Sequence, residues 1–387
     1  MAGKTGRRGH NEGSIYQRAS DGKWVGSVDL GWETGKRRRK VVYGKDRAEV
    51  SRKVSQLLHQ HQRGMPIQTA SKTVKVFLTE WLEQVVNPSK SYGTLRAYSI
   101  IVTKHLVPAI GKHPIEKLTQ QHVQAMLNAK QVEGLSLATV RQIRVVLRIA
   151  LNQAMRWDLV GRNVAALTTP PGGERFEGYG VSTDEVRAIM TAVQGDDLEA
   201  LYAIATSVGL RMAELLGLRW MDVDMDNGNI QVRRQLKVID GTPQLVELKT
   251  KSSRRTVPLA PPVLRLLRTH RKAQIAQRLE HGVPWSESGF VFAYQDGRPI
   301  SDSSLRNHWF TIRKAASLPD CVRFHDLRHG ALTIMAARGT APRTLMGIAG
   351  HSQIATTMQV YAHLDTESVR AATSLMSDLY EAEKDAL

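Results

Sequence analysis

The sequence predicts a multidomain α+β protein. The first domain is expected to be a small three-stranded sheet with one helix, the second all-α, and the third mainly α with a small antiparallel sheet. Three observations support this. The chain of 387 residues is longer than a single domain usually is. The hydrophobic pattern changes from strand-like to helical at Val74. Polar stretches that contain Pro and Gly interrupt the chain twice. The predicted domains span 1–65, 72–170 and 177–387.

The first domain begins with short β-rich runs, "GSIYQR", "KWVGSVDLGW" and "GKRRRKVVYG". The Asp-Gly and Thr-Gly steps between them favour tight turns, so the runs predict antiparallel strands. The stretch "RAEVSRKVSQLLHQHQ" follows and predicts one helix. Trp24, Trp32 and Tyr43 could either pack strand against helix or contact DNA, and we expect packing for most of them.

The second domain shows apolar residues at i, i+3 and i+4 in each of its main segments, which predicts amphipathic helices. These segments are "VKVFLTEWLEQVV", "GTLRAYSIIVTKHLVPAI", "TQQHVQAMLNAKQ" and "SLATVRQIRVVLRIALNQAMRW". In the third domain we expect helices up to about Leu218, a strand-rich insert from Ile230 to Leu259 with a turn at "DGTP", and helices from Pro261 to the end.

The charge of the chain is strongly basic and unevenly distributed. Lys and Arg number 54 against 36 Asp and Glu, a formal net charge of +18. The basic excess is 9 in residues 1–63 and 8 in residues 72–170, but only 1 in residues 171–387. An excess confined to two modules indicates a polyanionic partner, with nucleic acid favoured. The candidates for DNA contact are Arg37, Arg38, Arg39, Lys40, Lys104, Arg141, Arg144 and Arg148.

The sequence does not indicate a membrane or secreted protein. No apolar run approaches the roughly 18 residues of a membrane-spanning helix, and "MAGKTGRRGHNEGS" lacks the apolar core of a secretory signal. The single cysteine, Cys321, excludes an internal disulfide and is expected to fill the core without a chemical role. We therefore expect a cytoplasmic protein, associated with the nucleoid if its partner is DNA.

The stretch "HDLRH" suggests two alternatives, a zinc site or a clamp for a phosphate. On a helix His325, Arg328 and His329 would share roughly one face. A zinc-protease helix reads H-E-x-x-H, so the stretch is a near miss to that motif. A zinc ion would place two positive charges beside Arg328, and the sequence offers no evident glutamate ligand at the matching spacing, which favours the phosphate clamp.

Three further stretches accompany "HDLRH": "GLRMAELLGLRW", "ELKTKSSRRTVPL" and "GHSQIATTMQVYAH". Each alone is weak, because a single arginine, lysine or tyrosine is most often solvated or packed. In this order and separation, however, the chain resembles the tyrosine recombinases, specifically the phage-type integrases. The resemblance extends over essentially the whole chain. It implies the tyrosine recombinase fold, with an arm-type DNA-binding domain and a helical, SAM-like core-binding domain before the catalytic domain.

Carried over position by position, the resemblance implies the roles of particular residues. Lys249 would be the strand-borne lysine, but Lys251 lies in the same turn and the choice between them stays open. His329 is expected to be structural, and "GIAGHS" departs from the commoner Leu-Gly-His. The implied set is Arg211, with Glu214 as its orienter, Lys249, His325, Arg328, His351 and the nucleophile Tyr361.

The chemistry of a DNA phosphodiester accounts for these residue types. Attack by a tyrosine oxygen places added negative charge on phosphorus, which Arg211 and Arg328 could bind through paired hydrogen bonds. The leaving 5′ oxygen needs a proton, for which Lys249 is suited, and the phenol must lose one, for which His325 is suited. His351 could hydrogen-bond a phosphate oxygen.

The resemblance implies a site-specific recombinase that integrates, and excises, a mobile element through a 3′-phosphotyrosine, without a nucleotide or metal cofactor. The implied partners are double-stranded DNA at core and arm attachment sites, three further copies of the chain in a tetramer, a directionality factor and a host DNA-bending protein. The final stretch "SLMSDLYEAEKDAL" would pack on a neighbouring copy or fray as a terminal helix. Two alternatives remain, a type IB topoisomerase-like enzyme and a catalytically silent DNA-binding regulator.

Overall fold

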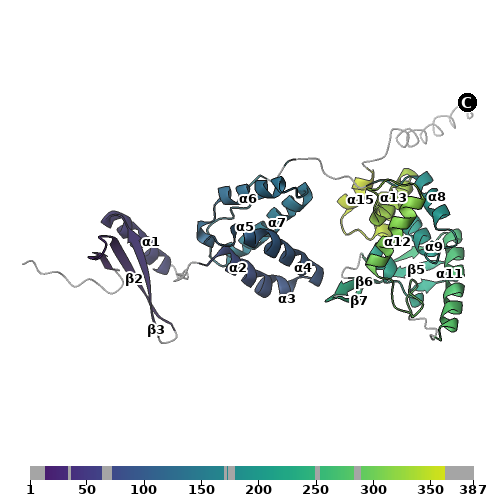
Figure 1. The fold of residues 1–387 in the computed structure, drawn as a ribbon, viewed down its shortest axis with the longest axis horizontal. Coiled ribbons are helices and arrows are strands. Elements are labelled where there is room, and N and C mark those ends of the chain that lie inside the picture. The colour runs from purple at the N-terminus through teal and green to yellow at the C-terminus, as the bar shows by residue number, and fades with distance from the viewer. Residues whose placement is uncertain are drawn as a thin grey trace, which may run out of the picture. The chain divides into compact units, whose positions relative to one another are not determined.

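The computed structural model describes residues 14–33, 36–62, 72–169, 172, 179–248, 253–282 and 289–361. The chain forms two compact units, Met1–Arg175 and Phe176–Leu387 (Figure 1). Within the first unit, one cluster of buried apolar residues lies in residues 15–58 and another in residues 74–165. Among the described residues, no helix has the length and apolar character needed to cross a membrane.

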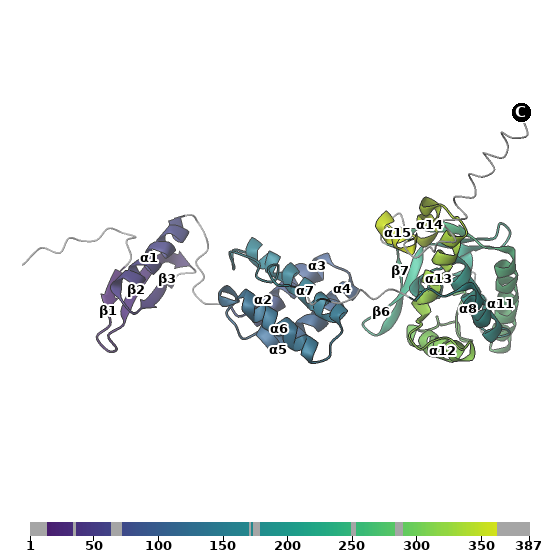
Figure 2. The same ribbon diagram turned by 90° about the horizontal axis from the view of Figure 1, so that it is seen from above.

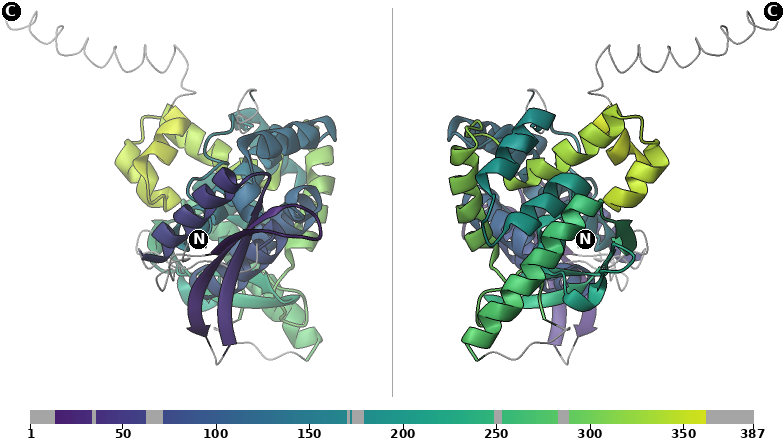
Figure 3. Two further views of the ribbon diagram at one scale, coloured as in Figure 1. Left: turned by 90° about the vertical axis from the view of Figure 1, so that its left-hand side faces the viewer. Right: turned by 90° about the vertical axis from the view of Figure 1, so that its right-hand side faces the viewer.

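The N-terminal part of the first unit is an antiparallel sheet covered by one helix (Figures 1 and 3), as the sequence predicts. The strands lie in the order β1-β2-β3, and Val28, Val50 and Val54 are buried between sheet and helix. Gly26 allows the close approach, since a Cβ there would lie 2.5 Å from a methyl group of Val54. The elements are β1 Ser14–Gln17, β2 Trp24–Glu33, β3 Lys36–Gly44 and α1 Arg47–Gln62.

The remainder of the first unit is helical (Figure 2). Phe77, Trp81 and Leu147 are among its fully buried side chains. Each of the four amphipathic segments that the sequence indicates is helical. The elements are α2 Val74–Trp81, η1 Leu82–Val86, α3 Asn87–Ser89, α4 Tyr92–Ile101, η2 Val102–Leu106, α5 Val107–Ile110, η3 Ile115–Lys117, α6 Gln120–Val132 and α7 Leu137–Arg156.

The periodicity did not reveal that the first two helical segments each contain a π-helical turn, η1 and η2. Each wide turn ends two residues before a proline, Pro88 or Pro108. A proline ring clashes with the carbonyl four residues earlier in a regular α-helix. The wide turn moves the local hydrogen-bonding partner to five residues earlier, and in this way the helix continues through the proline.

The second unit combines helices with two small antiparallel sheets, β4-β5-β8 and the hairpin β6-β7. The hairpin turns at Asp240 and Gly241, both with positive φ (49° and 79°), as its tight turn requires. The elements are α8 Thr183–Ala192, α9 Glu199–Val208, α10 Met212–Leu216, η4 Trp220–Asp222, β4 Val223–Asp224, β5 Asn229–Val232, β6 Arg234–Ile239, β7 Thr242–Glu247, β8 Arg255–Pro258, α11 Pro261–Glu280, α12 Asp302–Ala315, α13 Phe324–Ala337, α14 Pro342–Ala349 and α15 Ile354–Tyr361.

Helix α9 lies in the core of this unit and packs against α8, α11 and α13 (Figure 1). Helices α14 and α15 lie beside α13 (Figure 2). Nearly every residue of α9 is buried. This explains its almost uniformly apolar sequence, which a helix with one exposed face does not show. Because α9 and α13 are both central, the loops at their ends are placed with little freedom.

Two expectations about this unit are wrong in detail. The chain is not helical throughout after Pro261, since residues 289–301 form a loop closed by a bridge between Ala293 and Pro299. The Asp296-Gly297 step and Pro299 favour a turn there. Cys321 does not fill the core but is exposed, in the turn between α12 and α13.

Candidate active site

Arg211 and Glu214 occupy the first turn of α10. Helix α9 ends at Gly209, whose left-handed backbone (φ 68°) turns the chain and leaves Arg211 at the N-cap of α10. The carboxylate of Glu214 accepts hydrogen bonds from the backbone N–H of Arg211 (3.0 Å) and from its guanidinium (2.8 Å). Glu214 is 2% exposed, whereas the Arg211 side chain is 36% exposed. The buried carboxylate therefore orients an arginine that still faces solvent.

Arg255, which was not among the predicted site residues, shares the same carboxylate. Its guanidinium lies 2.9 Å from one oxygen of Glu214 and 3.3 Å from the other. Burial acts to raise the pKa of Glu214, but the hydrogen bonds from Arg255 and Arg211 outweigh burial and lower it. A signal was present in the sequence, because on β8 Arg255 faces the same side as the buried Val257.

Arg328 projects from α13 into the same place and is 5% exposed. It donates hydrogen bonds to the carbonyls of Gly209 and Ala349, both at 2.6 Å, and to Nε2 of His351 at 3.0 Å. Burial, followed by the positive charge of Arg211, lowers the pKa of Arg328 to about 9. The guanidinium therefore remains charged at neutral pH.

The C-terminus of α14 lies among these arginines. The last carbonyls of a helix lack partners within the helix and carry its negative dipole end, so they attract cations. Three consecutive carbonyls are each taken by a different guanidinium. The pairs are Arg255 with Ile348 (2.7 Å), Arg328 with Ala349 (2.6 Å) and Arg211 with Gly350 (3.3 Å).

His351 follows directly and is neutral near pH 7. Burial, followed by the guanidiniums of Arg328, Arg211 and Arg255, lowers its pKa to about 4. Since an arginine only donates, Nε2 of His351 must accept from Arg328, and the ring proton must be on Nδ1. Nδ1 then donates to the hydroxyl of Thr357 on α15 (2.9 Å), which is fully buried.

The two histidines of "HDLRH" have different surroundings. The side chain of His325 is exposed and hydrogen-bonds no described residue. Partial desolvation, followed by the charge of Arg328, nevertheless lowers its pKa. His329 is half-buried, and its Nδ1 lies 3.3 Å from the hydroxyl of Thr333 one turn later, which agrees with a structural role. Within the ranges that the structure describes, no three His, Cys, Asp or Glu side chains are grouped to hold a metal ion.

Tyr361 is the last described residue and does not hydrogen-bond the arginines. Its hydroxyl donates to the carbonyl of Thr340, in the turn between α13 and α14. Burial raises the pKa of Tyr361, so its phenol is protonated at neutral pH. Lys249 and Lys251 lie outside the described residues. Of the predicted set, the structure brings together Arg211, Glu214, Arg328 and His351, with His325 nearby.

The chain is similar to two known domain families and to several individual proteins. The model described as "Phage integrase family" matches residues 181–368, and that described as "Phage integrase, N-terminal SAM-like domain" matches residues 73–131. A "Tyrosine recombinase XerC-like" protein of Caldanaerobacter subterraneus subsp. tengcongensis is 28% identical over 367 residues, 90% of this chain and 94% of its own. The chain belongs to the phage integrase family of tyrosine recombinases. The recombinase is also 24% identical to the "ICEBs1 integrase" of Bacillus subtilis, over 94% of this chain and 99% of that protein.

Solved integrases share the fold of the recombinase, which confirms the predicted fold class. An integrase of the transposon Tn1549, in complex with a circular intermediate DNA, has a TM-score of 0.69 at 22% identity, over 79% of this chain and all of that one. A lambda integrase dimer bound to a core site has a TM-score of 0.55 at 17% identity, over 92% of this chain and 96% of that one.

The predicted DNA contacts of the recombinase differ in how free their side chains are. Arg39, Lys104 and Arg148 are exposed, whereas Arg141 is half-buried. Arg144 instead donates to the hydroxyl and carbonyl of Thr168 and to the carbonyl of Ala166, at 2.8–3.1 Å. These bonds favour a structural role for Arg144. The strand β3 carries Arg37 and Arg38, whose side chains lie outside the described residues, and Lys40 is half-buried.

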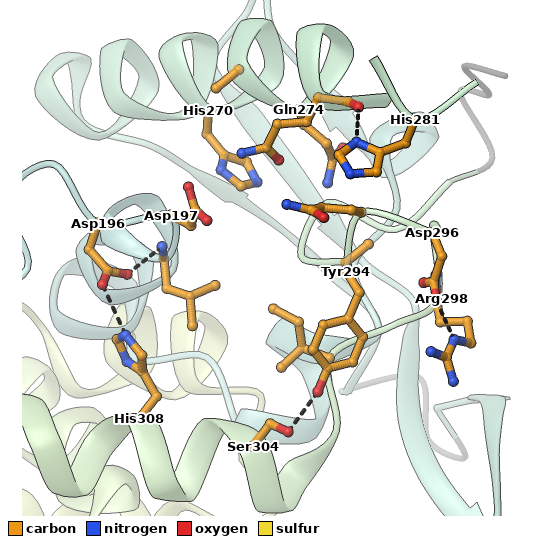
Figure 4. A pocket seen from close by; sticks show the side chains of 16 residues that line it. Asp196, Asp197, His270, Gln274, His281, Tyr294, Asp296, Arg298, Ser304 and His308 are labelled. Carbon is orange, nitrogen blue, oxygen red and sulfur yellow. Dashed lines mark hydrogen bonds and ion pairs between the residues drawn. The ribbon is translucent and has the colours of Figure 1, made fainter. Parts of the chain in front are cut away.

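The recombinase also has a cavity of about 730 Å³ away from the arginine cluster, between the turn that precedes α9, helices α11 and α12, and the 293–300 loop (Figure 4). Burial raises the pKa of Tyr202, so its hydroxyl donates to Nδ1 of His308, whose Nε2 then donates to Asp196. Figure 4 shows the imidazole of His308 directed at Asp196 and the hydroxyl of Tyr294 directed at Ser304. Because these side chains hydrogen-bond one another, they offer no evident catalytic group, and the arginine cluster remains the candidate active site.

Proposed function

We propose that the recombinase is a site-specific integrase that cleaves and rejoins DNA through a 3′-phosphotyrosine at Tyr361. The observation that carries the proposal is the convergence of Arg211 and Arg328 on adjacent carbonyls at the end of α14, directly before a neutral His351. Two fixed guanidiniums beside an uncharged hydrogen-bonding ring suit a phosphodiester whose negative charge increases during reaction.

In the cleavage step, the Tyr361 oxygen forms a bond to phosphorus while the bond from phosphorus to the 5′ oxygen breaks. Arg211 and Arg328 bind the nonbridging oxygens, where charge accumulates. Rejoining is the reverse reaction, in which a 5′-hydroxyl attacks phosphorus and releases the tyrosine. The phosphotyrosine retains the energy of the diester, so no nucleotide is consumed.

Two protons must move during cleavage. The phenol proton of Tyr361 passes to His325, which is available as a base at neutral pH because its pKa is lowered. Lys249, or Lys251, donates a proton to the leaving 5′ oxygen. Before attack, Tyr361 must exchange its hydrogen bond to the Thr340 carbonyl for contact with the phosphate. Because this bond holds the Tyr361 hydroxyl away from the arginines, we expect α15 to move when DNA binds.

His351 would also donate a hydrogen bond to a nonbridging oxygen of the phosphate. Its Nε2 accepts from Arg328. For His351 to donate to a phosphate through Nε2, the proton must shift from Nδ1 or a second proton must be taken up. Contact with a phosphate, which carries negative charge, raises the pKa of the ring and favours this change.

The three segments are proposed to divide the binding of DNA. Residues 1–65 would bind arm sites, residues 72–170 core sites, and residues 177–387 would carry the chemistry. The basic excess in residues 1–170 supports this division. We further propose that four copies assemble on two duplexes at the nucleoid. A solved structure with the same fold is a lambda integrase tetramer bound to a Holliday junction, which supports that assembly.

The proposal also includes a mobile element as the substrate, with a directionality factor and a host DNA-bending protein as accessory partners. Relatives named as integrases, among them the ICEBs1 integrase, support integration of an element. Attachment sites of the element would supply both the core and the arm sequences.

A nicked suicide substrate tests the chemistry. Cleavage near the nick releases a short fragment, so the covalent protein–DNA adduct cannot rejoin and accumulates. The wild type should form an adduct that survives a denaturing gel, and Tyr361→Phe should bind the DNA equally well but form none. Adduct formation should persist in EDTA. Adduct with Tyr361→Phe would exclude this nucleophile, and activity lost in EDTA but restored by zinc would support the metal alternative.

A further inference from the structure

The side chain of Arg255 is buried, and its hydrogen bonds reach groups that hold Arg211 and the segment before His351. Its side chain is 7% exposed. Besides Glu214, it donates to the carbonyl of Ile348 through Nε (2.7 Å) and to the carbonyl of Ser253 (3.0 Å). One side chain therefore connects β8, the first turn of α10 and the last turn of α14.

The connection to α14 is close enough to constrain the sequence there. Gly350 has a left-handed backbone (φ 64°), and a Cβ at this position would lie 2.9 Å from Nη1 of Arg255. The absence of a side chain at Gly350 thus leaves space for the guanidinium. His351 comes next in the chain, so Arg255 holds the segment that presents it.

The connection to α10 concerns Arg211. Each oxygen of Glu214 accepts from both Arg211 and Arg255. Without Arg255, the buried carboxylate would lose its most buried cation and would be short of donors, a state that costs free energy. Arg211 is the nearest remaining donor, and its partly exposed guanidinium could turn inward to supply the missing bonds.

We propose that Arg255 is a positioning residue for strand cleavage: by sharing Glu214 and anchoring Ile348, it keeps the Arg211 guanidinium directed at the scissile phosphate and fixes the segment before His351. Arg255 itself does not touch the DNA in this scheme. The inference rests on the proposed function, since it assigns Arg255 to the same reaction.

The first test compares binding with cleavage. Arg255→Gln should bind core-site DNA within threefold of wild type, because the basic modules are unchanged. Its single-turnover cleavage of the nicked suicide substrate should be slower by about 100-fold, the effect typical of a small displacement of a catalytic group. Arg255→Lys retains the positive charge but not the forked donors, so its cleavage rate should lie between those of the wild type and Arg255→Gln.

The second test asks whether Arg255 acts through Arg211. If it does, adding Arg255→Gln to Arg211→Ala should slow cleavage far less than Arg255→Gln slows the wild type, since one of the groups being positioned is already absent. The slowing that remains measures the second role, the anchoring of Ile348 before His351. On a substrate with a neutral methylphosphonate at the scissile position, the defects of Arg255→Gln and Arg211→Ala should shrink together, because less charge needs binding. A general loss of structure would slow both substrates equally.

Arg234→Gln is the matched control. Arg234 pairs with the buried Asp222 (3.0 Å) in the same unit but does not contact Glu214 or α14. It should cleave within threefold of wild type. The proposal is overturned if Arg255→Gln cleaves as fast as this control, or if its defect multiplies fully with that of Arg211→Ala. If Arg255→Gln does not fold, the same comparisons are made with Arg255→Lys. A wild type that forms no adduct would instead contradict the proposed function.

Discussion

The imidazole of His351 is uncharged near neutral pH, since burial and the nearby guanidiniums lower its pKa to about 4. Its two ring nitrogens are committed, one accepting from Arg328 and the other donating to Thr357. A histidine in this state is a directional link between two helices. The individual residues of the site are thus defined by their protonation as much as by their positions.

This state of His351 predicts a pH dependence of stability. Its pKa in the folded protein lies below the ordinary value of about 6.5, so between pH 6.5 and about 4 the unfolded chain binds a proton that the folded chain does not. The free energy of unfolding should therefore fall as the pH falls through this window, by at most about 3 kcal/mol from this residue. Chemical denaturation at pH 7.0 and 4.5 measures it. His351→Gln should lose correspondingly less stability over the same interval, and an equal loss would contradict the assigned protonation.

The proton donor to the leaving 5′ oxygen can be identified with a substrate whose leaving group needs no proton. An alkoxide leaves poorly without a proton, whereas a thiol with a pKa of about 8.5 leaves readily as a thiolate. Replacing the bridging 5′ oxygen by sulfur should therefore restore cleavage by Lys249→Ala but not by Arg211→Ala, which lacks a donor to the nonbridging oxygens. Rescue of Lys251→Ala instead, together with normal cleavage by Lys249→Ala, would exchange the two lysines.

Helix α14 contributes to the candidate site through the carbonyls at its C-terminal end. It has eight residues, and its C-terminal carbonyls receive three arginines that come from β8, α10 and α13. A helix end provides several acceptors within one turn, which a strand does not. It therefore suits a place where several cations must be held close together in spite of their mutual repulsion.

Gly350 and Gly347 make a matched pair for testing this element. Gly350→Ala forces a side chain into a left-handed backbone, at roughly 1–2 kcal/mol, and crowds the guanidinium of Arg255. Gly347 lies inside α14 with open space where a Cβ would be, and Gly347→Ala should stabilise the helix by about 1 kcal/mol. Gly350→Ala should lower both the thermal unfolding temperature and the rate of suicide-substrate cleavage, whereas Gly347→Ala should lower neither. Equal behaviour of the two variants would show that the Gly350 conformation is unimportant.

For the whole molecule, charge and chemistry are separated along the chain. The basic excess lies in residues 1–170, whereas the arginine cluster lies in a part of the chain that is almost neutral overall. Long-range attraction to the phosphate backbone is then a property of the first two segments. The arginines of the site contribute to the reaction through their fixed positions.

Removal of residues 1–63 tests this separation. The change takes away a net charge of nine and the predicted arm contacts, but leaves the excess of eight in residues 72–170. Cleavage of isolated core sites should persist, while integration between full-length attachment sites should fail. Integration at the normal rate by the truncated protein would refute the arm-binding role, and inactivity on every substrate would indicate that the segment is needed for folding.

The sequence by itself determined the elements that depend on local pattern. The three strands and helix at the N-terminus, the four amphipathic segments and the hairpin at Asp240 follow from periodicity and turn residues, which act between neighbours in the chain. The residue types of the candidate site could also be named from their order, although their roles stay predictions. The two π-helical turns were not predicted from the sequence, because each spans only five residues within a longer helical pattern.

Only the tertiary structure decided which groups share the site. Arg255 lies 93 residues from its partner Ile348, and Arg211 lies 139 residues from Gly350. No local pattern reports such contacts, since they depend on the packing of α9, α13 and α14. The same packing sets the burial that lowers the pKa of His351 and selects its tautomer. Protonation and long-range hydrogen bonding arise from desolvation and proximity, and both exist only once the chain has folded.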